Sequence, residues 1–303
     1  MNAAAAVLAC EAQAASARRI AKACGFAFVP SKVAAFADGE IRVRIEDDVD
    51  GRDLYLVQPT SPPVNERLVA LLLLADAARG AGAARLTAVM PYFGYSRQDQ
   101  RKQPGEARSA QLAARMLECA GVDRAVVLEP HSQALENAFR IPFTQVEADE
   151  AALGLVRKWR LRDLTVVSPD AGGLKRAQRY AAALGAPLAV VAKSRPHADA
   201  TVALAPLGEV RGRQCLIVDD MASTGGTIAG AAQALAAAGA AAVHAFFVHA
   251  VMAPGAFERI KKAGVRLIGS TDSVPRAGKA PRGLEIVSAD ALLSRAVRSL
   301  SRT

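Results

Sequence analysis

The sequence predicts an α/β protein built from two successive halves, each a mainly parallel sheet flanked by helices. Short runs rich in Val, Leu and Ile alternate with helical runs, and this alternation is typical of parallel sheets buried on both faces. The alternation occurs twice, over 53–128 and again over 164–269. The length of 303 residues is also enough for two domains.

The hydrophobic pattern locates the individual elements in chain order. We expect strands at 53–58, 85–90, 124–128, 164–168, 187–191, 214–218, 241–248 and 265–269. We expect helices at 65–80, 108–120, 172–184, 225–238 and 255–263, and a last helix at 289–300. Glycine, the usual residue after a helix end, closely follows four of these helices at Gly121, Gly185, Gly239 and Gly264.

The less regular segment 131–150 separates the two halves. We therefore expect an N-terminal domain over 1–146 and a C-terminal domain over 147–303. The last helix can pack on its own C-terminal domain or back on the N-terminal domain. Ligands of open α/β sheets bind at the carboxyl ends of the strands. Functional residues are therefore expected in the loops that follow strands.

Composition narrows the class of partner. The net charge of +9 is compatible with nucleic acid, acidic lipid or phosphorylated small molecules. Basic residues are spread along the chain and aromatic residues make up only 5% of it, so we expect no nucleic-acid binding. The four cysteines include no CxxC pair, which indicates reduced thiols.

The chain carries no sign of a targeting or membrane segment. Glu11 and Gln13 interrupt the N-terminal apolar stretch, which also lacks the basic region of a secretory signal. The apolar region 234–251 contains Gly239 and two histidines, so it fits a helix, a turn and a buried strand better than a membrane span. We expect a soluble, cytoplasmic protein with no membrane partner.

A buried strand, two acidic residues and a glycine turn follow one another in 216–227, LIVDDMASTGGT. Glycines let backbone N–H groups approach an anion, and the following helix N-terminus adds unpaired donors. Hydroxyl donors are available from Ser223, Thr224 and Thr227. Asp219 and Asp220 suit two neighbouring ribose hydroxyls, or a metal that bridges them. Acceptors for a diol beside donors for a phosphate indicate a phosphorylated sugar.

The alternative is a strand that ends in two exposed aspartates, with a glycine turn that caps a helix. STGG alone favours that alternative, whereas the twelve-residue combination favours the sugar phosphate. The stretch VDDMASTGGT resembles the phosphoribosyl diphosphate loop of type I phosphoribosyltransferases and of ribose-phosphate diphosphokinases. The resemblance implies two similar type I phosphoribosyltransferase-like domains. It also implies a ribose 5-phosphate site formed by Asp219, Asp220, Ser223, Thr224, Gly225, Gly226 and Thr227.

Two further segments are similar to ATP-binding segments of the diphosphokinases. FADGEIRVRI at 36–45 has Phe36, which can stack on a base, although alone it is an ordinary β-turn between strands. PYFGYSRQDQRK at 91–102 has Arg97, which can pair with phosphate oxygens, and the alternative is a charged surface loop. The resemblance implies ATP contacts from Phe36, Asp38, Gly39, Glu40, Arg97, Gln98 and Asp99.

Metal-binding and catalytic residues are implied in the same way. His131 in EPHS and Asp170 in SPDAGG each follow a strand, and the matching family residues hold Mg²⁺, which prefers few protein ligands. Lys193 and Arg195 in VVAKSR match a catalytic pair, and Arg195 is also expected to contact ribose 5-phosphate. Without the resemblance, a lone histidine and these two cations would be ordinary structural or surface residues.

The resemblance extends over about 25–270 and implies one reaction. The diphosphoryl group of Mg-ATP passes to the 1-hydroxyl of ribose 5-phosphate, giving 5-phosphoribosyl 1-diphosphate and AMP. A homodimer or hexamer is implied as well, because family members share the adenine site between subunits. Two alternatives stay open: a phosphoribosyltransferase, which has no need of 36–40 or 91–102, and a non-catalytic regulatory paralogue, which would be expected to lose Lys193, His131 or Asp170.

Three positions depart from the common bacterial pattern of that family. Ser223 stands where the loop usually has an acidic residue, Pro130 lies in EPH in place of Asp-Leu-His, and Ser194 separates Lys193 from Arg195 in place of an arginine. These departures concern regulation, metal detail and nucleotide preference more than the reaction.

Overall fold

A computed structural model describes residues 4–101, 103–194, 203–276 and 278–302. The chain divides into two compact units. Unit 1 contains the described residues of Met1–Glu147, Ser273–Pro275 and Ala289–Thr303, and unit 2 contains those of Ala148–Asp272 and Arg276–Ser288. Across the described ranges, no helix is both long enough and apolar enough to cross a bilayer.

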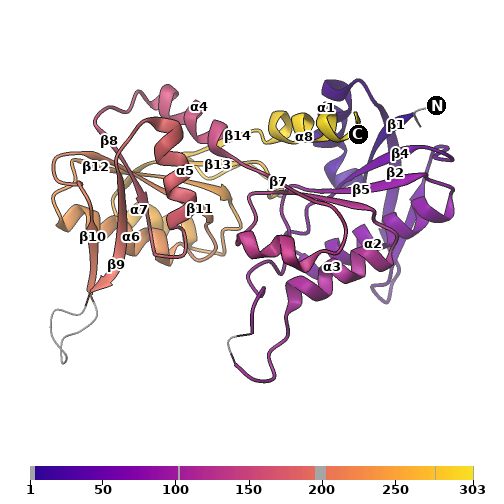
Figure 1. Cartoon of the computed structure of the whole chain (residues 1–303), viewed down its shortest axis with the longest axis horizontal. Coiled ribbons are helices and arrows are strands. Elements are labelled where there is room, and N and C mark those ends of the chain that lie inside the picture. The colour runs from indigo at the N-terminus through magenta and orange to yellow at the C-terminus, as the bar shows by residue number, and fades with distance from the viewer. Residues whose placement is uncertain (1–3, 102, 195–202, 277, 303) are drawn as a thin grey trace. The chain divides into compact units, whose positions relative to one another are not determined.

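Unit 1 is built on a seven-stranded sheet in the order β3-β2-β1-β4-β5-β6-β7 (Figure 1). Its strands are β1 Ala5–Ala9, β2 Ala27–Ala35, β3 Ile41–Ile45, β4 Asp53–Val57, β5 Arg85–Met90, β6 Arg124–Leu128 and β7 Phe143–Val146. Its helices are α1 Ala14–Cys24, α2 Val64–Gly80, α3 Ser109–Cys119 and α8 Asp290–Leu300, with short 3₁₀ turns η1 Glu11–Gln13 and η2 Gln133–Ala138. Every strand pair is parallel except the β2–β3 hairpin at the edge.

Unit 2 repeats this arrangement, with the order β10-β9-β8-β11-β12-β13-β14. Its strands are β8 Leu164–Ser168, β9 Leu188–Ser194, β10 Ala203–Leu207, β11 Gln214–Met221, β12 Ala242–His249, β13 Val265–Thr271 and β14 Leu284–Val287. Its helices are α4 Asp149–Trp159, α5 Leu174–Leu184, α6 Gly226–Ala237 and α7 Ala256–Lys262. The β9–β10 pair is antiparallel and the other pairs are parallel. The predicted fold class is confirmed.

The predicted strands and helices are all present, with ends that differ from the prediction by at most three residues. They could be located because their apolar runs are long and buried, as in β4, where all five residues are buried. No range was predicted for β1, α1, β2, β3, β7, α4, β10 or β14, although strands were expected on either side of the turn at 36–40. β1 lies in an alanine-rich run in which helix and strand cannot be separated by periodicity, and β7 and β14 are too short to show a period.

The last helix, α8, packs against α1 in unit 1, and the two lie side by side in Figure 1. The hydroxyl of Ser16 donates to Oδ1 of Asp290 at 2.5 Å, and Arg19 pairs with the same carboxylate. The thiol of Cys24 donates to the carbonyl oxygen of Ser294 at 3.4 Å. The helix therefore completes unit 1, although it follows unit 2 in the sequence.

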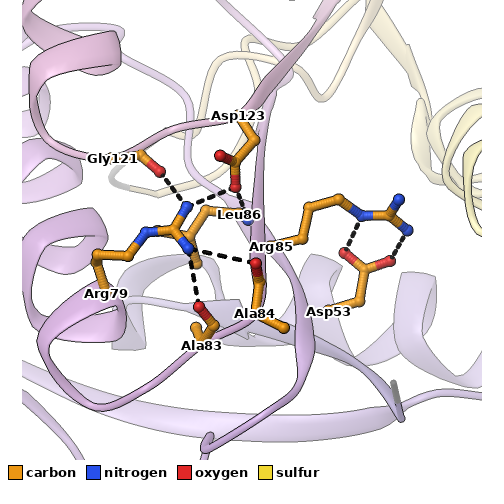
Figure 2. A network of polar contacts seen from close by, with 8 residues as sticks. All are labelled: Asp53, Arg79, Ala83, Ala84, Arg85, Leu86, Gly121 and Asp123. Atoms are coloured by element: carbon orange, nitrogen blue, oxygen red, sulfur yellow. Dashed lines mark hydrogen bonds and ion pairs between the residues drawn. The ribbon is translucent and has the colours of Figure 1, made fainter. Parts of the chain in front are cut away.

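Figure 2 shows a network of polar contacts around Arg79, in the last turn of α2. Its guanidinium donates to the carbonyl oxygens of Ala83 at 2.9 Å and Gly121 at 2.7 Å, and pairs with Asp123 at 2.5 Å. Oδ2 of Asp123 also accepts from the N–H of Leu86 at 2.8 Å. One arginine thus joins the segments that follow α2 and α3 to the start of β5, far from the carboxyl ends of the strands.

Candidate sugar-phosphate and nucleotide sites

In unit 2, two neighbouring parallel strands bring acidic residues to one edge of the sheet. β8 pairs with β11 in parallel, so the carboxyl ends of both strands meet at the same edge. Asp170 follows β8, while Asp219 and Asp220 lie at the end of β11. This is the edge at which ligands of open α/β sheets bind.

The loop after β11 is held by backbone bonds to the segment after β12. The N–H of Met252 donates to the carbonyl oxygen of Ala222 at 2.8 Å, and the N–H of Ala253 donates to that of Ser223 at 2.9 Å. Gly225 then precedes α6 with φ +74°, a left-handed conformation that favours glycine. A Cβ at Gly225 would lie 2.7 Å from the carbonyl oxygen of Ala256. Glycine is therefore required at this position by packing as well as by conformation.

The next glycine faces a different environment. Gly226 is the first residue of α6 and has no positive φ, and a Cβ there would approach only Oγ1 of Thr224 at 3.6 Å and Nη1 of Arg259 at 3.9 Å. Thr224 and Thr227 are exposed and Ser223 is half-buried. The N-cap residue of α6 is Gly225, which has no side chain to cap the helix, and the N–H groups of the first turn have no partner within the helix. These amides and hydroxyls border open space and can bind an anion.

The two aspartates beside this loop are mostly buried. The side chain of Asp219 is 15% exposed and that of Asp220 is 4% exposed. Nη1 of Arg176, from α5, lies 3.4 Å from Oδ1 of Asp219 and 3.3 Å from Oδ1 of Asp220. Burial raises the pKa of Asp219 well above its ordinary value, Asp220 raises it further, and Arg176 lowers it. A ligand that donates hydrogen bonds here would relieve the repulsion between the carboxylates.

Asp170 lies in the turn between β8 and α5. Its Oδ1 accepts from the N–H of Gly173 at 3.0 Å, and its carbonyl oxygen accepts from the hydroxyl of Ser168 at 2.7 Å. The side chain is exposed, and no described residue donates to its Oδ2. Such a carboxylate suits Mg²⁺, which prefers oxygen ligands and takes few of them from protein. Within the described ranges, no group of three or more candidate metal ligands is clustered.

In unit 1, the tip of the β2–β3 hairpin contains the residues assigned to adenine. The N–H of Phe36 donates to the carbonyl oxygen of Glu40 at 2.8 Å, and Gly39 makes the turn with φ +93°. Oδ1 of Asp38 accepts from the N–H of Glu40 at 3.1 Å. The ring of Phe36 is 53% exposed. The turn therefore presents an aromatic face and two carboxylates to solvent.

The loop after β5 begins buried and becomes exposed. The N–H of Gly94 donates to Oγ1 of Thr60 at 2.6 Å, which fixes the loop against the segment after β4. Arg97 is exposed and Asp99 is half-buried. The carbonyl oxygen of Gln98 accepts from the N–H of Ala110 at 3.2 Å, in the first turn of α3. This loop and the hairpin tip leave the same sheet from strands three positions apart, roughly 14 Å between strand axes.

The remaining residues selected from the sequence are described only in part. His131 is exposed beyond the end of β6, and Glu129 before it is buried with φ +39°. The backbone of Lys193 lies in β9 opposite Leu204, while its side chain is outside what the structure describes. Arg195 lies outside the described residues altogether.

Comparison with known proteins gives a consistent family for both units. A family model for the N-terminal domain of ribose phosphate pyrophosphokinase matches residues 5–121, and a phosphoribosyl transferase domain model matches 141–275. A ribose-phosphate pyrophosphokinase of Bordetella parapertussis is 40% identical over 89% of this chain and 88% of its own length. The chain belongs to the ribose-phosphate pyrophosphokinase family.

Other members of the family agree with this result. A ribose-phosphate pyrophosphokinase of Burkholderia pseudomallei is 39% identical over 94% of this chain and 86% of its own length. The crystal structure of phosphoribosylpyrophosphate synthetase from Mycobacterium smegmatis matches with a TM-score of 0.90 and 32% identity, covering 98% of this chain and 99% of that one. The resemblance found in the sequence is confirmed, and so are the two phosphoribosyltransferase-type domains. The chain is an enzyme of the ribose-phosphate pyrophosphokinase type, a transferase of nucleotide biosynthesis.

Two arginines near the sugar-phosphate loop were not selected from the sequence. Arg176 contacts both aspartates from α5, and Arg259 donates from α7 to the carbonyl oxygen of Thr224 at 3.1 Å. Each lies within the first four residues of a helix, next to the loop that the helix follows. A basic residue in the first turn of such a helix is the signal that could have identified them, because the helix N-terminus disfavours positive charge unless an anion lies nearby.

Proposed function

We propose that this family member transfers the β,γ-diphosphoryl group of Mg-ATP to the 1-hydroxyl of ribose 5-phosphate, giving 5-phosphoribosyl 1-diphosphate and AMP. The observation that carries the proposal is the edge of unit 2, where Asp219 and Asp220 precede a loop of open backbone amides and hydroxyls. Acceptors for a diol thus stand beside donors for a phosphate, as a phosphorylated ribose requires.

The acceptor substrate is assigned to the loop 223–227 and the aspartates before it. The 5-phosphate accepts from the first-turn amides of α6 and from the hydroxyls of Ser223, Thr224 and Thr227. Gly225 shapes the turn, and Gly226 leaves room for the phosphate to approach the backbone. Asp219 and Asp220 accept from the 2- and 3-hydroxyls. Arg195 is assigned to this substrate on the resemblance alone.

The nucleotide is assigned to two segments of unit 1. The exposed ring of Phe36 stacks on adenine, and Asp38 and Glu40 accept from its exocyclic amine, with Gly39 forming the turn. Arg97 pairs with phosphate oxygens, and Gln98 and Asp99 complete the contacts. The exposure of the hairpin tip and of Arg97 supports this assignment, because neither is occupied by packing within the described chain.

Charge on the transferring group is balanced by cations. Lys193 and Arg195 are assigned to neutralise charge that develops on the diphosphoryl group. His131 and Asp170 are assigned to hold Mg²⁺, which would supply positive charge against the phosphates of ATP. No covalent nucleophile is needed, because transfers of this kind depend mainly on positioning and electrostatics. The 1-hydroxyl of the sugar attacks the β-phosphorus directly and AMP leaves.

We also infer self-association into a homodimer or hexamer in the cytoplasm, without nucleic-acid or membrane partners. The resemblance supports a shared adenine site. Light scattering coupled to size exclusion measures the state directly, and a monomer at assay concentration with full activity would contradict this inference.

The reaction is tested by incubating the protein with ribose 5-phosphate, Mg²⁺ and ATP while ³¹P NMR follows the products. We expect AMP and 5-phosphoribosyl 1-diphosphate in equal amounts, formed only when the sugar phosphate is present. A chain that instead consumes phosphoribosyl diphosphate with a nucleobase is a phosphoribosyltransferase. A chain that binds ATP without turnover is a regulatory paralogue. Either result overturns the proposal.

A further inference from the structure

Arg176 is a nearly buried cation that reaches the two aspartates from a different element. Its side chain is 10% exposed, and it lies in the first turn of α5, whereas the aspartates end β11. A Cβ on the nearby Gly173 would clash with Oγ of Ser168 at 2.9 Å but would meet Nη1 of Arg176 only at an ordinary contact distance of 3.7 Å. Burying a guanidinium costs free energy, and its pairing with two carboxylates offsets that cost. The arrangement indicates a role for Arg176 at the aspartate pair.

The contacts divide the two oxygens of Asp219 into different roles. Its Oδ1 accepts from the N–H of Asp220 at 2.9 Å and lies 3.4 Å from Nη1 of Arg176. Its Oδ2 accepts from no described residue, and the side chain keeps a partly exposed surface. The carboxylate is therefore fixed at one oxygen and open at the other.

One nitrogen of the arginine lies within ion-pair distance of both aspartates. Distances of 3.4 Å to Asp219 and 3.3 Å to Asp220 exceed the 2.7–2.9 Å that is usual for a charge-assisted hydrogen bond. The positive charge therefore offsets the mutual repulsion of the two carboxylates and holds them side by side. Oδ2 of Asp219 remains able to accept from a ligand's hydroxyl.

We propose that Arg176 is a positioning residue that holds Asp219 and Asp220 in register with the two hydroxyls of a sugar cis-diol, and so sets the preference for ribose 5-phosphate over 2-deoxyribose 5-phosphate. The proposal rests on the proposed function. A site that hydrogen-bonds a substrate hydroxyl strongly rejects an analogue without it, because its buried polar groups are then left unpaired. If the aspartates lose their common orientation, the 2-hydroxyl of ribose 5-phosphate loses its acceptor. The preference for ribose 5-phosphate over its 2-deoxy analogue then falls.

The test compares kcat/KM for the two sugar phosphates in four proteins: the full-length wild type, Arg176→Gln, Arg176→Lys and Arg179→Gln. Arg179 is the matched control, since it lies on the same helix but pairs with Asp149 at 2.7 Å, away from the aspartate pair. We expect Arg176→Gln to lower the ratio of the two kcat/KM values at least about ten-fold, the effect of one charged hydrogen bond, while Arg179→Gln keeps the wild-type ratio. Arg176→Lys keeps the charge and is expected to restore part of the preference.

Several outcomes overturn the proposal. If Arg176→Gln is folded by circular dichroism and Tm but keeps the wild-type ratio of the two kcat/KM values, Arg176 has a purely structural role. This holds whether its activity toward both sugars is unchanged or equally reduced. If Arg176→Gln does not fold, the ratio of Arg176→Lys decides, and an unchanged ratio contradicts the proposal. Wild-type protein that produces no AMP from either sugar would instead contradict the proposed function.

Discussion

Alanine is predicted to have different effects at two adjacent glycines of the loop 223–227. It should lower the stability of the protein at Gly225 and weaken the binding of ribose 5-phosphate at Gly226. In Gly225→Ala the new methyl group would lie 2.7 Å from the carbonyl oxygen of Ala256 and 3.0 Å from Cγ1 of Ile260, at φ +74°. The left-handed strain and the overpacking together cost about 2–5 kcal/mol. We therefore expect the Tm to fall by about 5–15 °C.

In Gly226→Ala the backbone is helical and the methyl group meets nothing closer than 3.6 Å. The free energy of unfolding should stay within about 1 kcal/mol of the wild type, with any change in the stabilising direction. The methyl group would, however, occupy the space between Thr224 and Arg259 that the phosphate is proposed to fill. Loss of one or more charged hydrogen bonds from the backbone should raise KM for ribose 5-phosphate about 10- to 100-fold.

Differential scanning calorimetry measures the Tm of both variants, and initial rates of AMP formation measure KM. Gly212→Ala serves as a control, because Gly212 also has a positive φ but a Cβ there meets nothing within 4 Å. A wild-type KM in Gly226→Ala would refute the placement of the phosphate at this loop. A Gly225→Ala protein as stable as the control would refute the packing argument.

The remaining predictions concern catalysis, stability and pH. Lys193→Ala should lower kcat at least about 10²-fold, since it removes a donor aimed at developing charge, and near-normal turnover in a steady-state assay would end its catalytic assignment. Arg79→Ala leaves several carbonyl groups without their donor and should lower the free energy of unfolding in urea by about 2–4 kcal/mol, with no change in kcat/KM. The control Lys32→Ala breaks only the exposed ion pair with Glu46 and should lower it by less than about 1 kcal/mol. Burial lowers the pKa of His244 from 6.5 to about 4. The stability that its neutral form contributes is therefore complete above pH 6.5 and is lost as the pH falls toward 4, by about 3 kcal/mol in all. Urea unfolding of wild type and His244→Gln across this range should show the steeper loss in the wild type, and parallel curves would contradict the assignment.

The sequence was informative where the candidate site is formed by one continuous segment. The run from Asp219 to Thr227 contains a strand end, two acids, two glycines and a helix start, so its local geometry could be predicted from residue types alone. The strands themselves were found because burial on both faces leaves uninterrupted apolar runs, as in β4 and β12. Both features are properties of neighbouring residues.

The parts that sequence reasoning missed depend on contacts between distant segments. Arg176 lies 43 residues before Asp219, and nothing in the spacing indicates that its side chain turns back to the end of β11. Arg259 similarly contacts a loop 35 residues earlier in the chain. The sequence also treated Gly225 and Gly226 as equivalent, whereas the packing of Ala256 and Ile260 against only one of them gives the two glycines different roles.

The fate of the β-phosphate of ATP tests the central claim most directly. The protein is incubated with ribose 5-phosphate, Mg²⁺ and ATP carrying ³²P in the β position, and the products are separated by ion-exchange chromatography. Transfer of the intact diphosphoryl group predicts that all product label is in 5-phosphoribosyl 1-diphosphate and that AMP is unlabelled. Label in ADP, or label released as diphosphate or phosphate without a sugar product, would contradict the account.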